Sequence, residues 1–313
     1  MADKIATRES YGKALAEFGA KYENLVVLDA DLAAATKTGT FKKAFPDRFF
    51  NCGIAENNMI DVAVGLALSG KIPFASSFAM FAAGRSFEQV RNSVGYAHTN
   101  VKIGATHAGI TVGEDGATHQ CNEDIALMRT IPGMTILNPA DDTEARLAVE
   151  AAIKMEGPCY LRFGRMAVPV LFGADHKFEI GKGVKLAEGT DVSLIATGIE
   201  VEQALAAREL LAAEGISASV VNIHTIKPLD EALVVAEAQK TGCVVTCEEH
   251  SIIGGLGGAV AECLSEKCPV PVLRIGVQDV FGRSGPAKEL VSYFGLDAAA
   301  IAAKAKAAVA LKK

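Results

Sequence analysis

The sequence alternates short, almost continuous apolar runs with longer segments in which apolar residues recur at helical spacing. LVVLDA at 25–30 and IPFASSF at 72–78 are two such runs, and the segment at 55–70 between them carries an apolar stripe of helical period. A short apolar run is typical of a strand that is buried on both faces of a sheet. Strands that alternate with helices in this way predict an α/β fold built on a parallel sheet.

The alternation falls into two blocks that are separated by a stretch rich in turn residues. Residues 168–190 form this stretch, which lacks the strand–helix repeat of its flanks. At 313 residues, the chain is long enough for two domains of ordinary size. We therefore predict an α/β fold with two doubly wound open-sheet domains, at 1–170 and 191–313, joined by a linker at 171–190. The further strands that we expect lie at 48–54, 101–105, 134–139, 159–163, 191–198, 218–223, 243–249 and 270–277.

Composition excludes several kinds of partner. The net charge of −6 argues against nucleic acid, which needs a clustered basic face. The N-terminal MADKIATRESYGKAL carries charges where a signal peptide needs an apolar core, and no stretch reaches the ~20 apolar residues of a membrane span. The cysteines are scattered, which is typical of reduced thiols. We therefore expect a cytoplasmic protein that binds neither nucleic acid nor membrane, in which Arg, Lys or His would meet any anionic substrate.

One segment, THAGITVGEDGATHQ at 106–120, concentrates side chains that are able to do chemistry. It contains His107, His119 and the acidic pair Glu114 and Asp115, and it directly follows a predicted strand. In open α/β sheets, ligands bind at the carboxyl ends of the strands, where such loops lie. The simpler interpretation is two turns and a helix cap, and the residue types alone do not decide between the two.

Other polar and aromatic residues also have both a structural and a functional interpretation. A glutamate in the first turn of a helix, as predicted for Glu56, usually interacts with the positive end of the helix dipole. Glu56, however, lies between Gly-Ile-Ala and two asparagines, where a buried carboxyl is able to share a proton with a ring nitrogen. Phe78 and Phe81, after a predicted strand, are either core residues or a stacking platform. Arg162 and Arg165 are either solvated or bind an anion.

The motifs that would hold a metal or a phosphate are incomplete. GEDG at 113–116 has Glu in place of the first glycine of the GDG that begins a diphosphate–metal motif, and no Asn-Asn pair follows at the usual distance. The glycines at 254–258 do not spell G-x-G-x-x-G. Cys243, Cys247 and His250 lack the second pair of ligands that a zinc site needs. We therefore predict no metal site and no phosphate cradle in this chain.

Four segments together carry a resemblance to a known family. The segment at 106–120 matches T-H-x-x-I-x-x-G-E-D-G-x-T-H-Q, and GIAE at 53–56 is similar to a G-I-x-E motif. TIKPLD at 225–230 and EEHSIIGGLGG at 248–258 are similar to landmarks of a second domain. With these motifs, essentially the whole chain resembles the C-terminal half of transketolase, which consists of a pyrimidine-binding domain and a C-terminal domain.

The resemblance implies thiamine diphosphate as the cofactor. Glu56 corresponds to the glutamate that hydrogen-bonds N1′ of the aminopyrimidine, where proton exchange activates the thiazolium C2. Phe78 and Phe81 correspond to the aromatic pair that stacks on the pyrimidine, and Ile54 would lie beside them. Asp31 corresponds to an aspartate that reaches the cofactor.

The resemblance also implies a sugar phosphate as the substrate. His107 and His119 would bind sugar hydroxyls and stabilise the charge that develops at the carbonyl oxygen. Asp115 would hold the C2 hydroxyl of the ketose donor. Arg165 or Arg162 would bind the phosphate group, a task that suits a bidentate guanidinium.

The chain departs from the family pattern at two positions. A third aromatic residue of the ring pocket would fall at Gly84. A serine that helps to hold phosphate would fall near Ala35, with Thr36 and Thr38 as candidate replacements.

The resemblance does not cover the family's N-terminal diphosphate- and metal-binding domain, because the sequence begins at Met1 on the pyrimidine-binding domain. It therefore implies the B subunit of a split transketolase, which transfers a two-carbon glycolaldehyde unit only together with a partner. The partner would be the N-terminal-half subunit and would bind the diphosphate and a divalent metal, Mg²⁺ or Ca²⁺. Two copies of each subunit would form a heterotetramer.

Two other functions stay open at this point. The β subunit of a 2-oxoacid dehydrogenase, or an enzyme similar to deoxyxylulose-phosphate synthase, would share the fold and the cofactor. The paired His107 and His119 around GEDG favour a ketose over an oxoacid. A non-catalytic assembly or regulatory subunit is the alternative from another class, and the presence of Glu56 and Asp115 argues against it.

Overall fold

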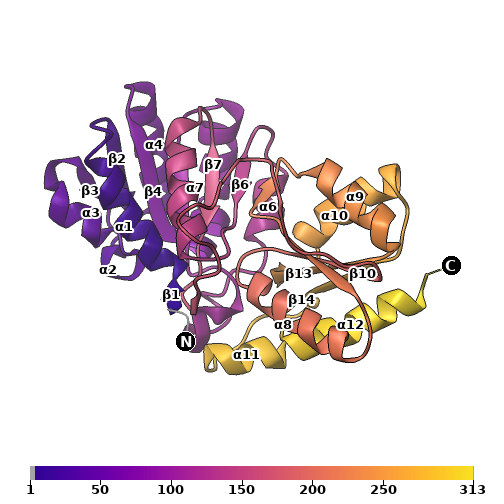
Figure 1. Ribbon diagram of the computed structural model, residues 1–313. Coiled ribbons are helices and arrows are strands. Elements are labelled where there is room, and N and C mark those ends of the chain that lie inside the picture. The colour runs from indigo at the N-terminus through magenta and orange to yellow at the C-terminus, as the bar shows by residue number, and fades with distance from the viewer. Residues whose placement is uncertain (1–3, 313) are drawn as a thin grey trace.

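The computed structural model describes residues 4–312 and contains two open sheets, each with helices on both faces (Figure 1). All strands of the first sheet run parallel except β12, which pairs antiparallel with β6. The predicted α/β fold class is confirmed. In spatial order, the first sheet contains β12 (Thr225–Lys227), β6 (Thr135–Leu137), β7 (Cys159–Arg162), β5 (Lys102–Thr106), β4 (Ile72–Phe78), β2 (Leu25–Asp29) and β3 (Phe49–Asn51).

Two hydrophobic cores hold helices against the faces of the first sheet. On one face, Tyr11, Leu15 and Phe18 form an apolar stripe along α1 and pack with α7. Asp141 caps the N-terminus of α7, because its side chain accepts a hydrogen bond from the Glu144 N–H at 2.8 Å. One face carries α1 (Thr7–Gly19), α3 (Gly39–Ala44) and α7 (Asp142–Lys154), and the other carries α4 (Glu56–Leu68), α6 (Asp124–Arg129) and the π-helical segments Met80–Arg85 and Val90–Tyr96, which flank α5 (Phe87–Gln89).

The second sheet is smaller and is covered in the same way. Its parallel strands are buried along most of their length, as expected for a sheet with helices on both faces. In spatial order it contains β14 (Val272–Val277), β13 (Val244–Ser251), β10 (Val192–Ala196), β11 (Ala218–Asn222) and β9 (Val184–Ala187). One face carries α8 (Glu200–Ala213) and α12 (Ala298–Ala310), and the other carries α9 (Glu231–Thr241) and α10 (Leu256–Lys267).

The connection between the two sheets differs from the predicted linker at 171–190. Its last part forms β9, which pairs antiparallel with β11 at the edge of the second sheet. The sequence did not reveal β9 because it is short and mostly half-buried, so it has no continuous apolar run. Conversely, β12 follows β11 of the second sheet in the chain but pairs with β6 at the edge of the first sheet. A further ribbon of β1 (Lys4–Ala6) and β8 (Ala167–Pro169) ties the start of the described chain to the segment after β7.

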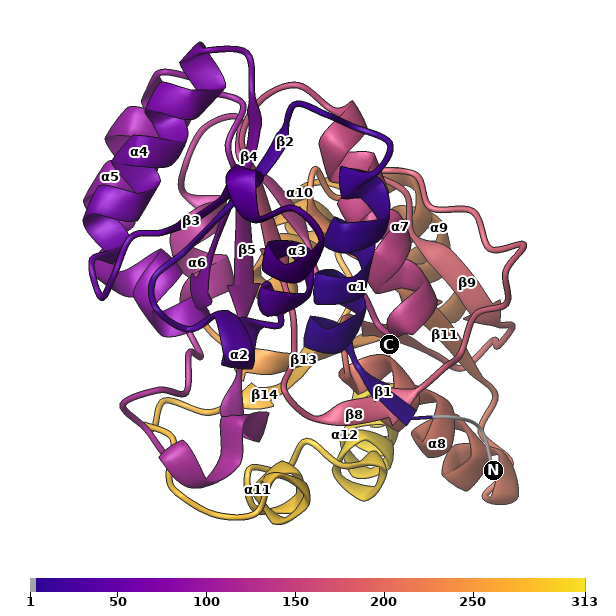
Figure 2. The same ribbon diagram turned by 90° about the vertical axis from the view of Figure 1, so that its left-hand side faces the viewer.

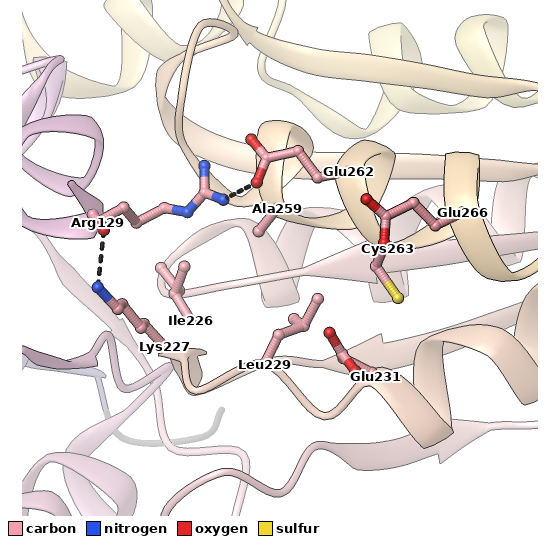
Figure 3. Close-up of a pocket in the computed structure, with 9 residues that line it drawn as sticks. All are labelled: Arg129, Ile226, Lys227, Leu229, Glu231, Ala259, Glu262, Cys263 and Glu266. Carbon is pink, nitrogen blue, oxygen red and sulfur yellow. Dashed lines mark hydrogen bonds and ion pairs between the residues drawn. The ribbon is translucent and has the colours of Figure 1, made fainter. Parts of the chain in front are cut away.

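An ion pair and hydrogen bonds from two cationic side chains to backbone carbonyl oxygens close the seam between the sheets. Arg129 of α6 forms an ion pair with Glu262 of α10 (Figure 3). It also donates to the Gly254 carbonyl oxygen at 2.7 Å. Lys227 Nζ donates to the carbonyl oxygens of Arg129 and Ile131 at 2.8 and 2.6 Å. An open pocket of about 260 Å³ lies beside these groups. The pairing of its cations indicates that this seam has a structural role. None of the helices within residues 4–312 has the length and apolar character needed to cross a membrane.

The fold brings the ends of neighbouring strands to one edge of the first sheet. In the register of β4 with β5, Phe78 lies opposite Thr106, and in that of β2 with β4, Asp29 lies opposite Ser76. Because these strands are parallel, the segments that follow them emerge on the same edge (Figure 2). The segment 106–120, the π-helical segment Met80–Arg85 and α2 (Ala33–Thr36) therefore meet there.

Candidate active site

Phe78 and His107 form the centre of a cluster at this edge. Phe78 ends β4 and His107 follows β5, so the pairing of the two strands sets the rings against each other. The rings are stacked, with centroids 3.8 Å apart and an interplanar angle of 29°. His107 has a left-handed backbone, with φ of 56°, which turns the chain sharply after the strand.

The hydrogen bonds of His107 define its tautomer. Its Nε2 lies 2.8 Å from Nη1 of Arg8, and a guanidinium only donates, so Nε2 is the acceptor. Nδ1 then carries the proton and lies 2.9 Å from the Thr106 hydroxyl oxygen. Burial, followed by the positive charges of Arg8, Arg165 and Lys37, lowers the pKa of His107 to about 3. His107 is therefore a neutral ring at ordinary pH.

Phe81 and His119 extend the cluster towards solvent. The Phe81 ring is stacked on Phe78, with centroids 6.0 Å apart, and the His119 ring meets Phe81 edge-on at 5.4 Å. Phe81 belongs to the π-helical segment, a conformation that often occurs at functional sites. At Gly84, where the family's third aromatic would lie, an added Cβ would be 2.2 Å from the methyl group of Met80. Met80 therefore fills part of that space.

Glu56 is joined to this cluster through an arginine that the sequence analysis missed. Glu56 begins α4, is only 1% exposed, and accepts hydrogen bonds from Arg85 Nη1 at 2.9 Å and from the Ser77 hydroxyl at 3.4 Å. The Arg85 guanidinium also lies over the Phe81 ring, 4.7 Å from its centroid. The predicted carboxyl is thus buried beside the aromatic pair. The only sequence signal for Arg85 was a cation within the otherwise apolar segment that follows Phe81.

The segment after His107 is a closed loop. Its base is formed by the Gly109 N–H, which donates to the Cys121 carbonyl oxygen at 2.9 Å. Inside it, a 3₁₀-helical segment covers Ile110–Asp115. Asp115 at the end of this segment is exposed, whereas His119 is half-buried and its Nδ1 lies 2.9 Å from the Thr118 hydroxyl oxygen. The loop therefore presents polar side chains next to the aromatic cluster.

The structure separates the two candidate arginines. Arg165 is half-exposed, donates to the Val112 carbonyl oxygen, and lies 3.0 Å from a carboxylate oxygen of Glu114. Arg162 is 3% exposed and forms an ion pair with the equally buried Asp124 at 2.8 Å. It also donates to the Glu249 carbonyl oxygen at 2.9 Å. The prediction that Arg162 binds substrate does not fit this structure, because its guanidinium is enclosed and already paired.

Thr36 and Thr38 are also turned away from any ligand. Both hydroxyl groups donate to the same Asp29 oxygen, at 2.7 and 2.9 Å, and both side chains are buried. As candidate replacements for a phosphate-binding serine they do not fit this structure, because both hydroxyl groups are buried and already paired. Arg8 lies near this part of the chain, because it donates to the Ala35 carbonyl oxygen at 3.1 Å and also faces His107.

The remaining predicted residues lie on the surface. Ile54, in the turn before α4, is 78% exposed, which is unusual for so apolar a side chain. Asp31, after β2, is exposed, has φ of 64°, and accepts a hydrogen bond from the Asn51 side chain at 3.0 Å. Neither is packed inside the aromatic cluster. Both are accessible to a bound molecule or to a second chain.

Comparison with known proteins decides the family. The model of the transketolase pyrimidine-binding domain matches residues 3–170, and that of the transketolase C-terminal domain matches residues 181–301. The chain belongs to the transketolase family. The predicted resemblance to the C-terminal half of transketolase is thereby confirmed, and the transketolase C-terminal domain supplies the second sheet.

Three relatives of this transketolase chain match it over nearly all of their own length. A protein from Methanocaldococcus jannaschii, described as a transketolase C-terminal section, is 54% identical over 94% of this chain and 93% of its own. A 6-deoxy-6-sulfo-D-fructose transketolase subunit from a Clostridium species is 47% identical over 93% and 90%. A solved structure described as a split gene transketolase, inactive beta4 tetramer, superposes with a TM-score of 0.93 at 54% identity over 99% of this chain and 100% of its own.

Proposed function

We propose that this chain is one subunit of a thiamine-diphosphate-dependent transketolase that moves a two-carbon unit from a ketose phosphate to an aldose phosphate. The observation that carries the proposal is the contact of Phe78, Phe81, His107 and His119 at one sheet edge, with Glu56 buried beside them. A conventional core would not place a buried histidine, a half-buried histidine and a buried carboxyl around an aromatic pair in which Phe81 is partly exposed.

The residues present fit the aminopyrimidine of the cofactor. Aromatic faces at Phe78 and Phe81 suit a planar ring, and the Glu56 carboxyl is able to hold a proton at a ring nitrogen. When bound, thiamine diphosphate supplies the nucleophilic carbon for breaking and forming carbon–carbon bonds beside a carbonyl. Glu56 would keep the proton at N1′, and Arg85 would hold the Glu56 side chain in place. Ile54 and Asp31 would contact the cofactor from the surface.

The substrate would lie against the closed loop. His107 is neutral and has its proton on Nδ1, so its Nε2 would accept a hydrogen bond from a sugar hydroxyl, and the ring would not act through charge. His119 and Asp115 would bind hydroxyl groups from the loop side. Arg165, with the positive charges of Arg8 and Lys37 nearby, would bind the anionic end of the sugar. These cations suit a phosphate or a sulfonate, and a sulfo-sugar transketolase subunit is among the relatives.

We further propose that the active site is completed by a separate N-terminal-half subunit. The sequence lacks a diphosphate cradle and a complete GDG motif, so the cofactor needs a second set of ligands. The proposal is supported by the solved relative, a split-gene transketolase chain that matches along all of its own length. The partner would hold the diphosphate and Mg²⁺ or Ca²⁺. Two copies of each subunit would form a heterotetramer in the cytoplasm.

A substrate comparison tests the proposed reaction against its nearest alternative. In the complex of both subunits, xylulose 5-phosphate with an aldose phosphate acceptor should be turned over, whereas pyruvate should not. Faster use of pyruvate would favour a 2-oxoacid dehydrogenase or a deoxyxylulose-phosphate-synthase-like enzyme. The non-catalytic alternative is tested by Glu56→Gln and His107→Asn. If both variants leave the turnover of the complex unchanged, this chain is an assembly subunit.

A further inference from the structure

The loop that follows His107 belongs structurally to the second domain. Ile110 inserts its side chain into the core that packs α8 and α12 against the second sheet. The Gln120 side-chain amide donates to the Ile110 carbonyl oxygen within the loop and to that of Arg283 in the second domain, both at 2.9 Å. The helix α11 (Ala287–Tyr293) packs on the 3₁₀-helical segment of the loop. The loop is therefore part of one sheet edge but is held by the other domain.

Glu249 makes the most direct of these contacts. It lies in β13, is 3% exposed, and its Oε1 accepts a hydrogen bond from the Thr111 backbone N–H at 2.6 Å. Its carboxyl approaches the loop so closely that a Cβ added at Gly109 would be 2.2 Å from Glu249 Cδ. Gly109 also has φ of 74°, so this position needs glycine for two independent reasons. The Glu249 backbone is fixed in turn by Arg162, which donates to its carbonyl oxygen.

We propose that Glu249 is a positioning residue for the sugar-binding loop, which it holds through Thr111 so that Asp115 and His119 face the substrate. The effect on catalysis rests on the proposed function, whereas the attachment of the loop to Glu249 does not. His107 precedes the base of the loop and is held separately by Arg8. Loss of the Glu249 contact should therefore loosen Asp115 and His119 and leave the His107 ring in place.

A neighbouring residue supplies a matched control. Glu248 lies in the same strand, is equally buried, and also accepts hydrogen bonds from backbone N–H groups, those of Leu256 and Gly257 at 2.7 and 2.8 Å. These belong to the first turn of α10, away from the loop. Glu249→Asp and Glu248→Asp thus remove the same methylene group and leave a similar cavity. They differ in the segment that is released: the loop loses one hydrogen bond in Glu249→Asp, and the first turn of α10 loses two in Glu248→Asp.

Amide hydrogen exchange on the purified chain tests the structural half without any assay of function. In Glu249→Asp, amides of residues 109–121 should exchange about tenfold faster or more than in wild type, while those of α10 stay unchanged. Glu248→Asp should give the opposite result. Glu249→Gln keeps a side-chain oxygen at the same distance from the backbone, so the loop amides should be as well protected from exchange as in wild type. Loop exchange in Glu249→Asp that equals wild type would overturn the proposal.

Kinetics of the complete complex test the catalytic half. Glu249→Asp should raise KM for the ketose donor about tenfold or more, with a smaller change in kcat, and Glu249→Gln should stay close to wild type. A loosened loop with an unchanged KM would refute the positioning role alone, whereas no transketolase activity in wild type would refute the proposed function. If Glu249→Asp does not fold, amide exchange of the wild-type chain is measured in increasing concentrations of urea.

The amides of the loop should then become exposed at the same urea concentration as those of β13. Exposure at the concentration that opens β5 would overturn the proposal.

Discussion

Nη1 of Arg8 and Nε2 of His107 lie 2.8 Å apart, and because the guanidinium only donates, the imidazole is held as an acceptor. We expect His107 to stay neutral through the acidic range, since its pKa is lowered to about 3 by burial and by Arg8. NMR of the histidine ring carbons should show no titration of His107 near the ordinary value of about 6.5. Arg8→Gln should raise the His107 pKa. Titration of His107 near 6.5 in the wild type would contradict this account.

The buried Glu249 carboxyl should make stability depend on pH. Burial raises the pKa of Glu249 to about 7 in the folded chain, from 4.5, although Arg162 and the Thr111 N–H oppose the shift. Between these values the folded state binds more protons than the unfolded state, so the contribution of Glu249 to the free energy of unfolding falls as pH rises. The difference in unfolding temperature, wild type minus Glu249→Gln, should therefore be smaller at pH about 8 than at pH about 5. An unchanged difference would rule out this titration.

The two arginines near the end of β7 should differ when each is replaced by methionine. Arg162→Met leaves the Asp124 charge buried without its partner, which should cost about 3–5 kcal/mol of unfolding free energy. Arg165→Met removes a half-exposed cation and should cost less than about 1 kcal/mol. In the complete complex, Arg165→Met should raise KM for the phosphorylated donor. Urea unfolding and steady-state kinetics of both variants check these outcomes, and an unaffected KM would remove Arg165 from the substrate site.

The ring platform should contribute to cofactor affinity. Phe81→Ala removes a stacked aromatic face next to Glu56, and we expect it to weaken thiamine diphosphate binding in the complex about tenfold. Tyr22→Ala is a suitable control, because Tyr22 is also half-buried but precedes β2 at the opposite edge of the same sheet. Calorimetric titration of the cofactor into both complexes provides the measurement. Equal losses in the two variants would mean that the effect is not local to the ring platform.

The fold was predictable where the physical signal is local. Buried parallel strands such as β2 and β4 are continuous apolar runs, and the cap at Asp141 follows from side chains three residues apart. β9 and β12 were not predictable in this way. Each is short, and each depends on a partner strand that lies elsewhere in the sequence. Hydrophobic periodicity does not report on such pairings.

The candidate site was predictable by residue type and by resemblance, but not in its pairings. Phe78, Phe81, His107 and His119 were expected to act together, and the structure brings their rings into contact. Arg8 was missed, since 99 residues separate it from His107 and no local pattern links them. The opposite environments of Arg162 and Arg165 depend on partners far away in the sequence, which no local pattern reveals: Asp124 and Glu249 for Arg162, and Glu114 for Arg165.

The central claim is that this chain supplies half of a transketolase active site, with Glu56 as its essential carboxyl. The direct measurement is ketol transfer from xylulose 5-phosphate by the purified chain, by the chain with its N-terminal-half partner, and by the same complex carrying Glu56→Gln. Glu209→Gln, at an exposed glutamate of α8, is the control substitution. We predict activity only in the mixture, unchanged by Glu209→Gln and reduced about 100-fold or more by Glu56→Gln. Transfer by the chain alone, or a Glu56→Gln complex within a few-fold of wild type, would contradict the claim.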